Sequence, residues 1–246
     1  MKRSELIMGM PITVEIVGSD KPEKTISRIF EYFRSVDRRF STYKSTSEIS
    51  KINRGLLRED WSDEMRRVLD LCEQTKRETN GYFDIRTPNG LLDPSGLVKG
   101  WSIQNAAEMT LKSGCEDFYI EAGGDIQVHG KNSDGEEWKI GIRNPFDSEE
   151  IVKTLQLTNA GIATSGTYIR GQHIYNPHTY GSQIDDVKSL TVIGPNIFDA
   201  DRFATATFAM GVEGVNFIEA LPGFEAYMIH SDKIATMTSG FERYVW

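Results

Sequence analysis

The sequence predicts an α+β fold of two packed lobes, with helices grouped toward the N-terminus, meandering mixed or antiparallel strands, and a ligand in the cleft between the lobes. One observation is helical periodicity across much of residues 20–111. Another is the change, from about Asp117 onward, to short alternating strands without a regular strand–helix repeat. With 246 residues, 39% of them hydrophobic, the chain is expected to form one domain over residues 1–246.

The first strand and the first helix follow from their residue types. Residues 11–17 (PITVEIV) alternate and are rich in β-branched side chains, which predicts a strand. Asp20 and Pro22 then supply a cap and a first-turn proline for a helix that we expect to continue to about Phe40. Its isoleucines and phenylalanines share one face, so this helix is expected to pack on a core.

Two further helices are expected in the first half of the chain. An amphipathic pattern predicts one over residues 62–79, and the Asn80-Gly81 pair after it suits the left-handed conformation that ends helices. The other is expected over residues 99–111. A polar stretch rich in serine and threonine separates the first helix from the second.

The second half is predicted to consist mainly of strands. Five of them (FYIEA, DIQVHG, EWKIGIR, VKTLQLT and KSLTVIG) precede helices over residues 198–210 and 214–221. Two more strands, FEAYMIH and KIATMTS, close the chain. Residues 131–137 (KNSDGEE) are expected to form a hairpin turn.

Composition excludes several classes of function. A net charge of −8 without a basic stripe argues against nucleic-acid binding. No run approaches the roughly 20 apolar residues that span a bilayer, so no transmembrane segment is expected. Two cysteines without a CxxC pattern fit a reducing compartment. We therefore expect a cytoplasmic protein, or a periplasmic one if a leader has been removed.

Residues 92–101 (LDPSGLVKGW) are the most informative stretch of the chain. They place an acid, two glycines and a lysine where a helical pattern begins. Backbone donors and a cation at a helix N-terminus bind phosphate groups, although the same pattern also fits an ordinary helix start with a cap and a turn. The stretch matches neither the Walker nor the GxGxxG pattern.

A second pair of residues points to a metal ion. Asp201 and Thr205 are four residues apart in a predicted helix, so their oxygens lie on the same side of it. A carboxylate and a hydroxyl are hard oxygen ligands of the kind that suit Mg²⁺, which takes few protein ligands. The alternative is that Asp199 or Asp201 only caps an ordinary helix.

Three other segments have residue types that serve chemistry or structure equally well. Tyr43 lies in a polar loop and can stack on a planar ligand or cover the core. Ser165 and Gly166 offer a hydroxyl and an N–H group to phosphate oxygens, unless their segment (GIATSG) is a simple hairpin. His173, before a proline turn, can act as a general base or be a structural histidine.

Taken together and in order, these segments resemble the ApbE family of flavin transferases. The motifs that carry the resemblance cover nearly the whole chain and are MGM at residues 8–10, STYKSTSEISKIN at 41–53, YFD at 82–84, DPSGLVKG at 93–100, GGD at 123–125, WKIGIRNP at 138–145, ATSG at 163–166, HIYNPHTYG at 173–181 and ADRFAT at 200–205. One motif departs from the family pattern DPxTG, because residues 176–181 read NPHTYG, with asparagine for aspartate and one extra residue.

The resemblance implies a T-fold-like flavin transferase domain that binds FAD with Mg²⁺. The enzyme would transfer FMN from FAD to a threonine hydroxyl of an acceptor flavoprotein and release AMP. Two alternatives stay open, an FAD pyrophosphatase giving FMN and AMP, and a non-catalytic FAD-binding protein.

The resemblance also assigns roles to residues. Gly96, through its carbonyl, Asp201 and Thr205 would hold the metal, so that Asp201 is also catalytic, and His173 would be the base that activates the acceptor threonine. The residues that would line the FAD are Met8, Tyr43, Tyr82, Phe83, Asp84, Asp93, Lys99 and Ile174. Ser165 and Gly166 are added to this set as possible phosphate contacts.

Overall fold

The computed structural model of the protein describes residues 1–166, 174–179 and 184–246. Its main feature is an eight-stranded sheet in the order β1-β2-β3-β4-β7-β8-β9-β10, and all neighbouring strands are antiparallel. The strands are β1 (Lys2–Ile7), β2 (Met10–Val17), β3 (Asp117–Ala122), β4 (Asp125–His129), β7 (Ala160–Gly166), β8 (Val187–Gly194), β9 (Glu225–His230) and β10 (Ala235–Met237). The predicted α+β class with mostly antiparallel strands is confirmed.

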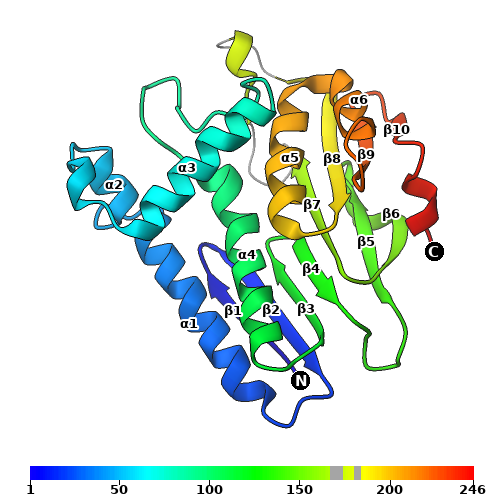
Figure 1. Cartoon of the computed structure of the whole chain (residues 1–246). Helices are drawn as coiled ribbons and strands as arrows, with labels where there is room; N and C mark the ends of the chain where they lie inside the picture. The colour runs from blue at the N-terminus through cyan, green and yellow to red at the C-terminus, as the bar shows by residue number, and fades with distance from the viewer. Residues whose placement is uncertain (167–173, 180–183) are drawn as a thin grey trace.

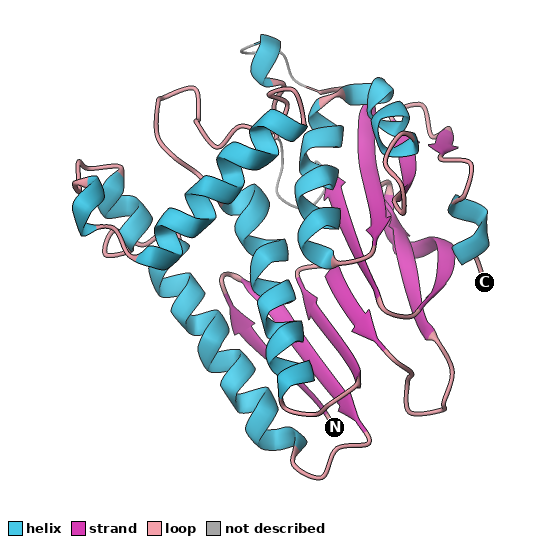
Figure 2. Cartoon of the chain, in the orientation of Figure 1, coloured by secondary structure: helices cyan, strands magenta, loops and turns pink. Residues whose placement is uncertain are grey.

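The helices cover one face of this sheet, and a separate hairpin covers the other (Figures 1 and 2). The α-helices are α1 (Pro22–Phe40), α2 (Glu48–Ile52), α3 (Asp63–Glu78), α4 (Ser95–Lys112), α5 (Ile197–Ala209) and α6 (Gly214–Glu219). The hairpin consists of β5 (Trp138–Asn144) and β6 (Asp147–Leu157). In the described residues no helix is both long and apolar enough to cross a bilayer.

Alternation along the strands divides the buried side chains between two cores. Phe118 and Ile120 of β3 pack with α1 and α4, whereas Ile126 and Val128 of β4 face the β5–β6 hairpin. Asp125 and Gln127, which alternate with these two residues along β4, therefore face the helices. Gln127 accordingly accepts a hydrogen bond from the backbone N–H of Ile197, at 2.8 Å, on the first residue of α5.

Most predicted elements exist, but three expectations need correction. The helix expected from Lys99 begins at Ser95, directly after Pro94, so the 92–101 stretch contributes the first turns of α4 itself. The 131–137 turn does not join a hairpin, because β4 and β5 belong to different sheets. Strand β1 was missed, because the first four residues of this edge strand (KRSELI) are charged or polar and give little apolar pattern.

Gly161 on β7 allows α5 to sit close to the sheet. A Cβ at this position would lie 2.1 Å from the backbone nitrogen of Ile197 and 2.3 Å from the carbonyl carbon of Asn196. Both are backbone atoms, so a side-chain rotation cannot relieve the overlap. The N-terminus of α5 is thus held between Gln127 of β4 and Gly161 of β7.

We predict that Gly161→Ala destabilises the protein by on the order of 3 kcal/mol, because α5 must move away from β7. Thermal unfolding should show this as a fall in Tm of roughly 5–10 °C. Ile162→Val, which removes one buried methylene from the same strand, is the control and should cost only about 1 kcal/mol. A Gly161→Ala variant as stable as this control would contradict the close approach.

Candidate functional site

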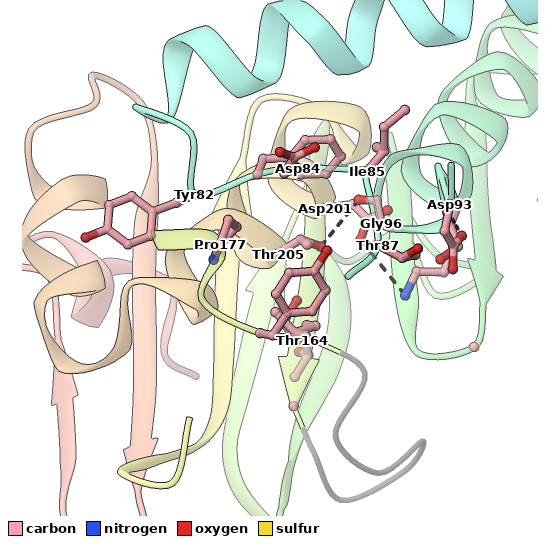
Figure 3. A pocket seen from close by; sticks show the side chains of 18 residues that line it. Tyr82, Asp84, Ile85, Thr87, Asp93, Gly96, Thr164, Pro177, Asp201 and Thr205 are labelled. Carbon is pink, nitrogen blue, oxygen red and sulfur yellow. Dashed lines mark hydrogen bonds and ion pairs between the residues drawn. The ribbon is translucent and has the colours of Figure 1, made fainter. Parts of the chain in front are cut away.

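A cavity lies where the first turns of α4, the middle of α5 and the end of β7 meet. It is open to solvent and contains about 1060 Å³ of space between atoms, the solvent at its mouth included. Figure 3 shows Gly96, Asp201 and Thr205 near its centre, with Tyr82 to one side and Asp93 to the other. The lining residues are Tyr82, Phe83, Asp84, Ile85, Thr87, Asp93, Ser95, Gly96, Lys99, Gly123, Thr164, Ser165, Gly166, Ile174, Tyr175, Pro177, Asp201 and Thr205.

Glycines of α4 let this helix approach α5 closely. A Cβ at Gly100 would lie 2.6 Å from Cβ of Asp201 and 2.8 Å from the carbonyl oxygen of Ile197. One turn earlier, a Cβ at Gly96 would lie 3.1 Å from Cγ2 of Thr205. Gly100 thus lies opposite Asp201, and Gly96 lies opposite Thr205. A larger residue at either glycine would push the two helices apart.

Backbone groups of α4 become polar partners for α5 at this crossing. The Gly100 N–H donates to Oδ2 of Asp201 at 2.7 Å. In a regular helix this N–H would be directed at the Gly96 carbonyl. That carbonyl oxygen here accepts a hydrogen bond from the Thr205 hydroxyl at 3.3 Å. Side chains of one helix are therefore bonded to the backbone of the other.

Gly96, Asp201 and Thr205, the predicted metal ligands, bring a carbonyl, a carboxylate and a hydroxyl oxygen to the cavity. Neighbouring ligands of an octahedral ion with Mg–O distances of about 2.1 Å lie about 3 Å apart, close to the separation of the Gly96 carbonyl and the Thr205 hydroxyl. All three donors are hard oxygens, as Mg²⁺ prefers. No group of three or more His, Cys, Asp or Glu suited to a metal occurs among the described residues, so a site rich in protein ligands is not found there.

Buried charges surround these oxygens. Lys99 lies with its Nζ 2.6 Å from Oδ2 of Asp125 and 4.0 Å from Oδ1 of Asp201. Asp125 is 1% exposed and Asp201 3%. Burial raises the pKa of Asp201, Lys99 lowers it, and the neighbouring Asp125 raises it again. When both carboxylates are ionised, a single ammonium leaves an excess negative charge, which a divalent cation would compensate.

Asp125 is the important site residue that the sequence did not assign. Its Oδ1 accepts a hydrogen bond from the Thr164 N–H at 3.0 Å, which joins β4 to β7 beside Lys99. The GGD motif at 123–125 and the alternation of β4 both pointed to a polar residue on the helix face. Asp125 does not line the cavity itself, and the lining residues that were not assigned are Ile85, Thr87, Ser95, Gly123, Thr164, Tyr175 and Pro177.

Residues 174–179 form a strap along one side of the cavity. The Tyr175 hydroxyl donates to the Arg86 carbonyl at 2.8 Å. The His178 ring packs edge-on against Tyr82, with ring centroids 4.5 Å apart. Asn176, which replaces the aspartate of the family pattern, accepts a hydrogen bond from the His178 N–H at 2.9 Å through Oδ1. An amide oxygen therefore caps the short turn Pro177–Thr179 as a carboxylate would.

Two predicted acidic contacts already have protein partners. Asp84 pairs through Oδ2 with Lys76 at 2.6 Å, and its Oδ1 accepts from the Arg86 N–H at 2.9 Å. Asp93 accepts a hydrogen bond from the Ser95 N–H at 3.0 Å. Asp93 therefore takes part in the helix start, the ordinary role weighed above, while also lining the cavity.

The structure brings most of the predicted site residues together but not all of them. Met8 lies at the β1–β2 turn with φ +57° and packs against the core, and Tyr43 is 98% exposed, so neither is among the cavity-lining residues. His173 lies outside the described residues. The predicted residues that do line the cavity are Tyr82, Phe83, Asp84, Asp93, Gly96, Lys99, Ser165, Gly166, Ile174, Asp201 and Thr205.

Comparison with known proteins gives one consistent family. The ApbE family model matches residues 8–89 and 85–228 of the chain. A FAD:protein FMN transferase of Vibrio cholerae is 31% identical over 166 residues, which are 64% of this chain and 48% of the relative. One of Escherichia coli is 27% identical over 157 residues, 60% of this chain and 45% of the relative. The chain thus spans about half the length of the curated relatives it matches.

Solved structures share the fold across the whole chain. The flavin transferase ApbE from Vibrio cholerae superposes with a TM-score of 0.86 at 23% identity, covering 99% of this chain and 98% of that one. The apo flavinyl transferase ApbE from Pseudomonas stutzeri superposes with a TM-score of 0.85 at 20% identity, covering 100% and 97%. At these identities the likeness establishes the fold.

We predict that Gly100→Ala lowers the stability of the protein although alanine favours helices. The propensity gain of up to about 1 kcal/mol is outweighed by an overlap with Asp201 that costs about 1–3 kcal/mol. Thermal unfolding without added ligand measures the net effect, expected as a Tm lower by a few degrees. Glu108→Ala, on an exposed part of the same helix, is the control and should change Tm little. An increase in Tm for Gly100→Ala would be inconsistent with the tight crossing.

Proposed function

The chain belongs to the ApbE family, and on that basis we propose that it transfers the FMN part of FAD to a threonine hydroxyl of an acceptor flavoprotein and releases AMP. The observation that carries this proposal is that Gly96, Asp201 and Thr205, which offer three hard oxygens, line the same cavity beside Lys99. Such a site suits a pyrophosphate neutralised by a divalent cation and an ammonium group.

The cavity offers suitable surfaces to both parts of FAD. Ser95 and Gly96 begin α4, whose N-terminus presents backbone N–H groups to phosphate oxygens, and Lys99 adds a cation one turn further on. Tyr82, Phe83 and Ile174 supply ring faces and aliphatic surface for a planar ring system. The dinucleotide would therefore lie with its pyrophosphate against α4.

Magnesium would be held by the Gly96 carbonyl, the Asp201 carboxylate and the Thr205 hydroxyl, the remaining positions being left to phosphate oxygens and water. When bound, the ion would neutralise the pyrophosphate and stabilise the charge that develops on it during transfer. The chain's contribution is to hold the three oxygens on two packed helices. Their spacing then depends on the α4–α5 crossing.

The transfer is a displacement at phosphorus. The acceptor threonine oxygen forms a bond to the phosphorus of the FMN part, and the bond from this phosphorus to the oxygen bridging to AMP breaks, so that AMP leaves with the bridging oxygen. The hydroxyl proton passes to a base, the role we propose for His173. Lys99, held by Asp125, would face the negative charge on the pyrophosphate.

The proposal is tested by incubating the protein with FAD, Mg²⁺ and an acceptor domain that carries a candidate threonine. We expect a UV-fluorescent acceptor band that survives denaturation, with AMP formed in equal amount. Asp201→Asn should reduce Mg²⁺-dependent turnover by more than the roughly 10- to 100-fold that loss of an outer-shell partner costs. Asp70→Asn, an exposed carboxylate on α3, is the matched control and should react as wild type.

Three outcomes would argue against the proposal. AMP formation at the same rate without any acceptor, together with free FMN, would instead indicate a pyrophosphatase. FAD binding without AMP would indicate a non-catalytic flavin-binding protein. Full activity of Asp201→Asn would rule out the metal assignment.

His173 is assigned by motif and requires its own test. His173→Asn should slow transfer at saturating FAD by about 100-fold or more, as expected for loss of a general base, while the Kd for FAD changes little. Single-turnover transfer and a separate FAD titration measure the two quantities. An equal loss of binding and transfer would assign this histidine to structure.

A further inference from the structure

Arg202 is a buried cation that none of the assignments above uses. Its side chain is 10% exposed, and it follows Asp201 directly on α5. Successive residues of a helix point about 100° apart, so neighbouring positions can serve different partners. Asp201 bonds the backbone of α4, whereas Arg202 bonds side chains of α3.

The guanidinium group joins the two helices through several donors. Nη1 donates to Oε2 of Glu78 and, at 3.3 Å, to Oγ1 of Thr75, both in the last turn of α3. Nε donates to Oδ1 of Asp199, in the first turn of α5, at 2.7 Å. A planar group with several fixed donors can hold these partners together, which a lysine ammonium cannot do.

An aromatic ring fixes the plane of the same guanidinium group. Its Cζ lies 4.1 Å from the ring centroid of Phe203, and the ring of Phe198 lies 5.2 Å away on the same helix. Stacking of this kind favours one orientation of the side chain. The hydrogen bonds therefore fix the direction of the Arg202 side chain toward α3, and the ring contact fixes the plane of its guanidinium group.

The position of this link relates it to the cavity. Glu78 ends α3, and the chain that follows supplies the Tyr82 and Phe83 wall of the cavity. At the other end of the link, Asp201 and Thr205 supply the oxygens of the proposed metal site. Arg202 thus joins the segment that bears the ring-binding wall to the helix that bears the metal ligands.

We propose that Arg202 is a positioning residue that sets the spacing between the Tyr82–Phe83 wall and the Asp201–Thr205 pair. It touches neither ligand and acts through α3 and α5. The proposal rests on the proposed function, because the spacing matters only if FAD bridges the wall and the metal site. A residue that merely stabilised the fold would affect unfolding without affecting the affinity of the folded protein.

The test is the binding of FAD and of Mg²⁺ to Arg202→Met, measured by titration well below Tm. We expect the Kd for FAD in the presence of Mg²⁺ to rise about 10-fold, the lower end of what loss of a supporting contact costs. Arg202→Lys should not restore wild-type affinity, because an ammonium group cannot reproduce the planar arrangement of donors. Glu78→Gln, at the partly exposed end of the link, should show a smaller rise and serves if Arg202→Met does not fold.

Arg243→Met is the control. Like Arg202, Arg243 pairs with a carboxylate, that of Glu225 at 2.9 Å, and lies over an aromatic ring, that of Tyr244 at 5.0 Å, but it is more exposed. Neither Arg243 nor Glu225 lines the cavity, so this variant should lower Tm without changing either Kd.

The results separate this proposal from the proposed function. If Arg202→Met, Arg202→Lys and Glu78→Gln all bind FAD and Mg²⁺ as wild type does, Arg202 only stabilises the fold and the proposal is overturned. Binding is measured without an acceptor, so a wild-type protein that binds FAD but releases no AMP contradicts the transferase activity alone. A wild-type protein that binds neither FAD nor Mg²⁺ overturns both.

Discussion

The close crossing of α4 and α5 is the constraint on which the rest of the site depends. Because Gly100 has no side chain, its N–H reaches Asp201, and the Gly96 carbonyl one turn away is available to Thr205. Gly161 allows the same α5 to rest on β7. Three positions without a Cβ therefore place one helix against both of its neighbours, and the arrangement of the proposed metal ligands follows from that placement.

A charge imbalance accompanies this packing. Taking Asp125 and Asp201 out of water has a cost that Lys99 offsets only in part, since one ammonium faces two carboxylates. The raised pKa of Asp201 has the same cause, because burial disfavours the ionised carboxylate. A bound divalent cation would favour the ionised carboxylate, so ligand binding and the stability of this part of the core would be coupled.

The sequence alone predicted the features of the site that depend only on residues close together in the chain. The spacing of Asp201 and Thr205 places them on one side of a helix whatever the rest of the fold, and the glycines and lysine of 92–101 are equally local. The pairing of Lys99 with Asp125 needs α4 to pack on β4, which no local pattern contains. Tyr43 shows the opposite case, because its motif was recognisable in the sequence whereas its exposed position is visible only in the fold.

Helix α5 carries two buried charges of opposite sign at adjacent positions, which is unusual for a helix at the centre of a fold. Asp201 is directed at α4 and Arg202 at α3, so a rotation of α5 that improved one set of bonds would disturb the other. Close-packed interiors have low compressibility, so small shifts of the helix cannot relieve such a disturbance. The orientation of α5 is consequently fixed by polar contacts on both sides, and a rigid helix is what the proposed metal site needs if its ligands are to keep their spacing before an ion arrives.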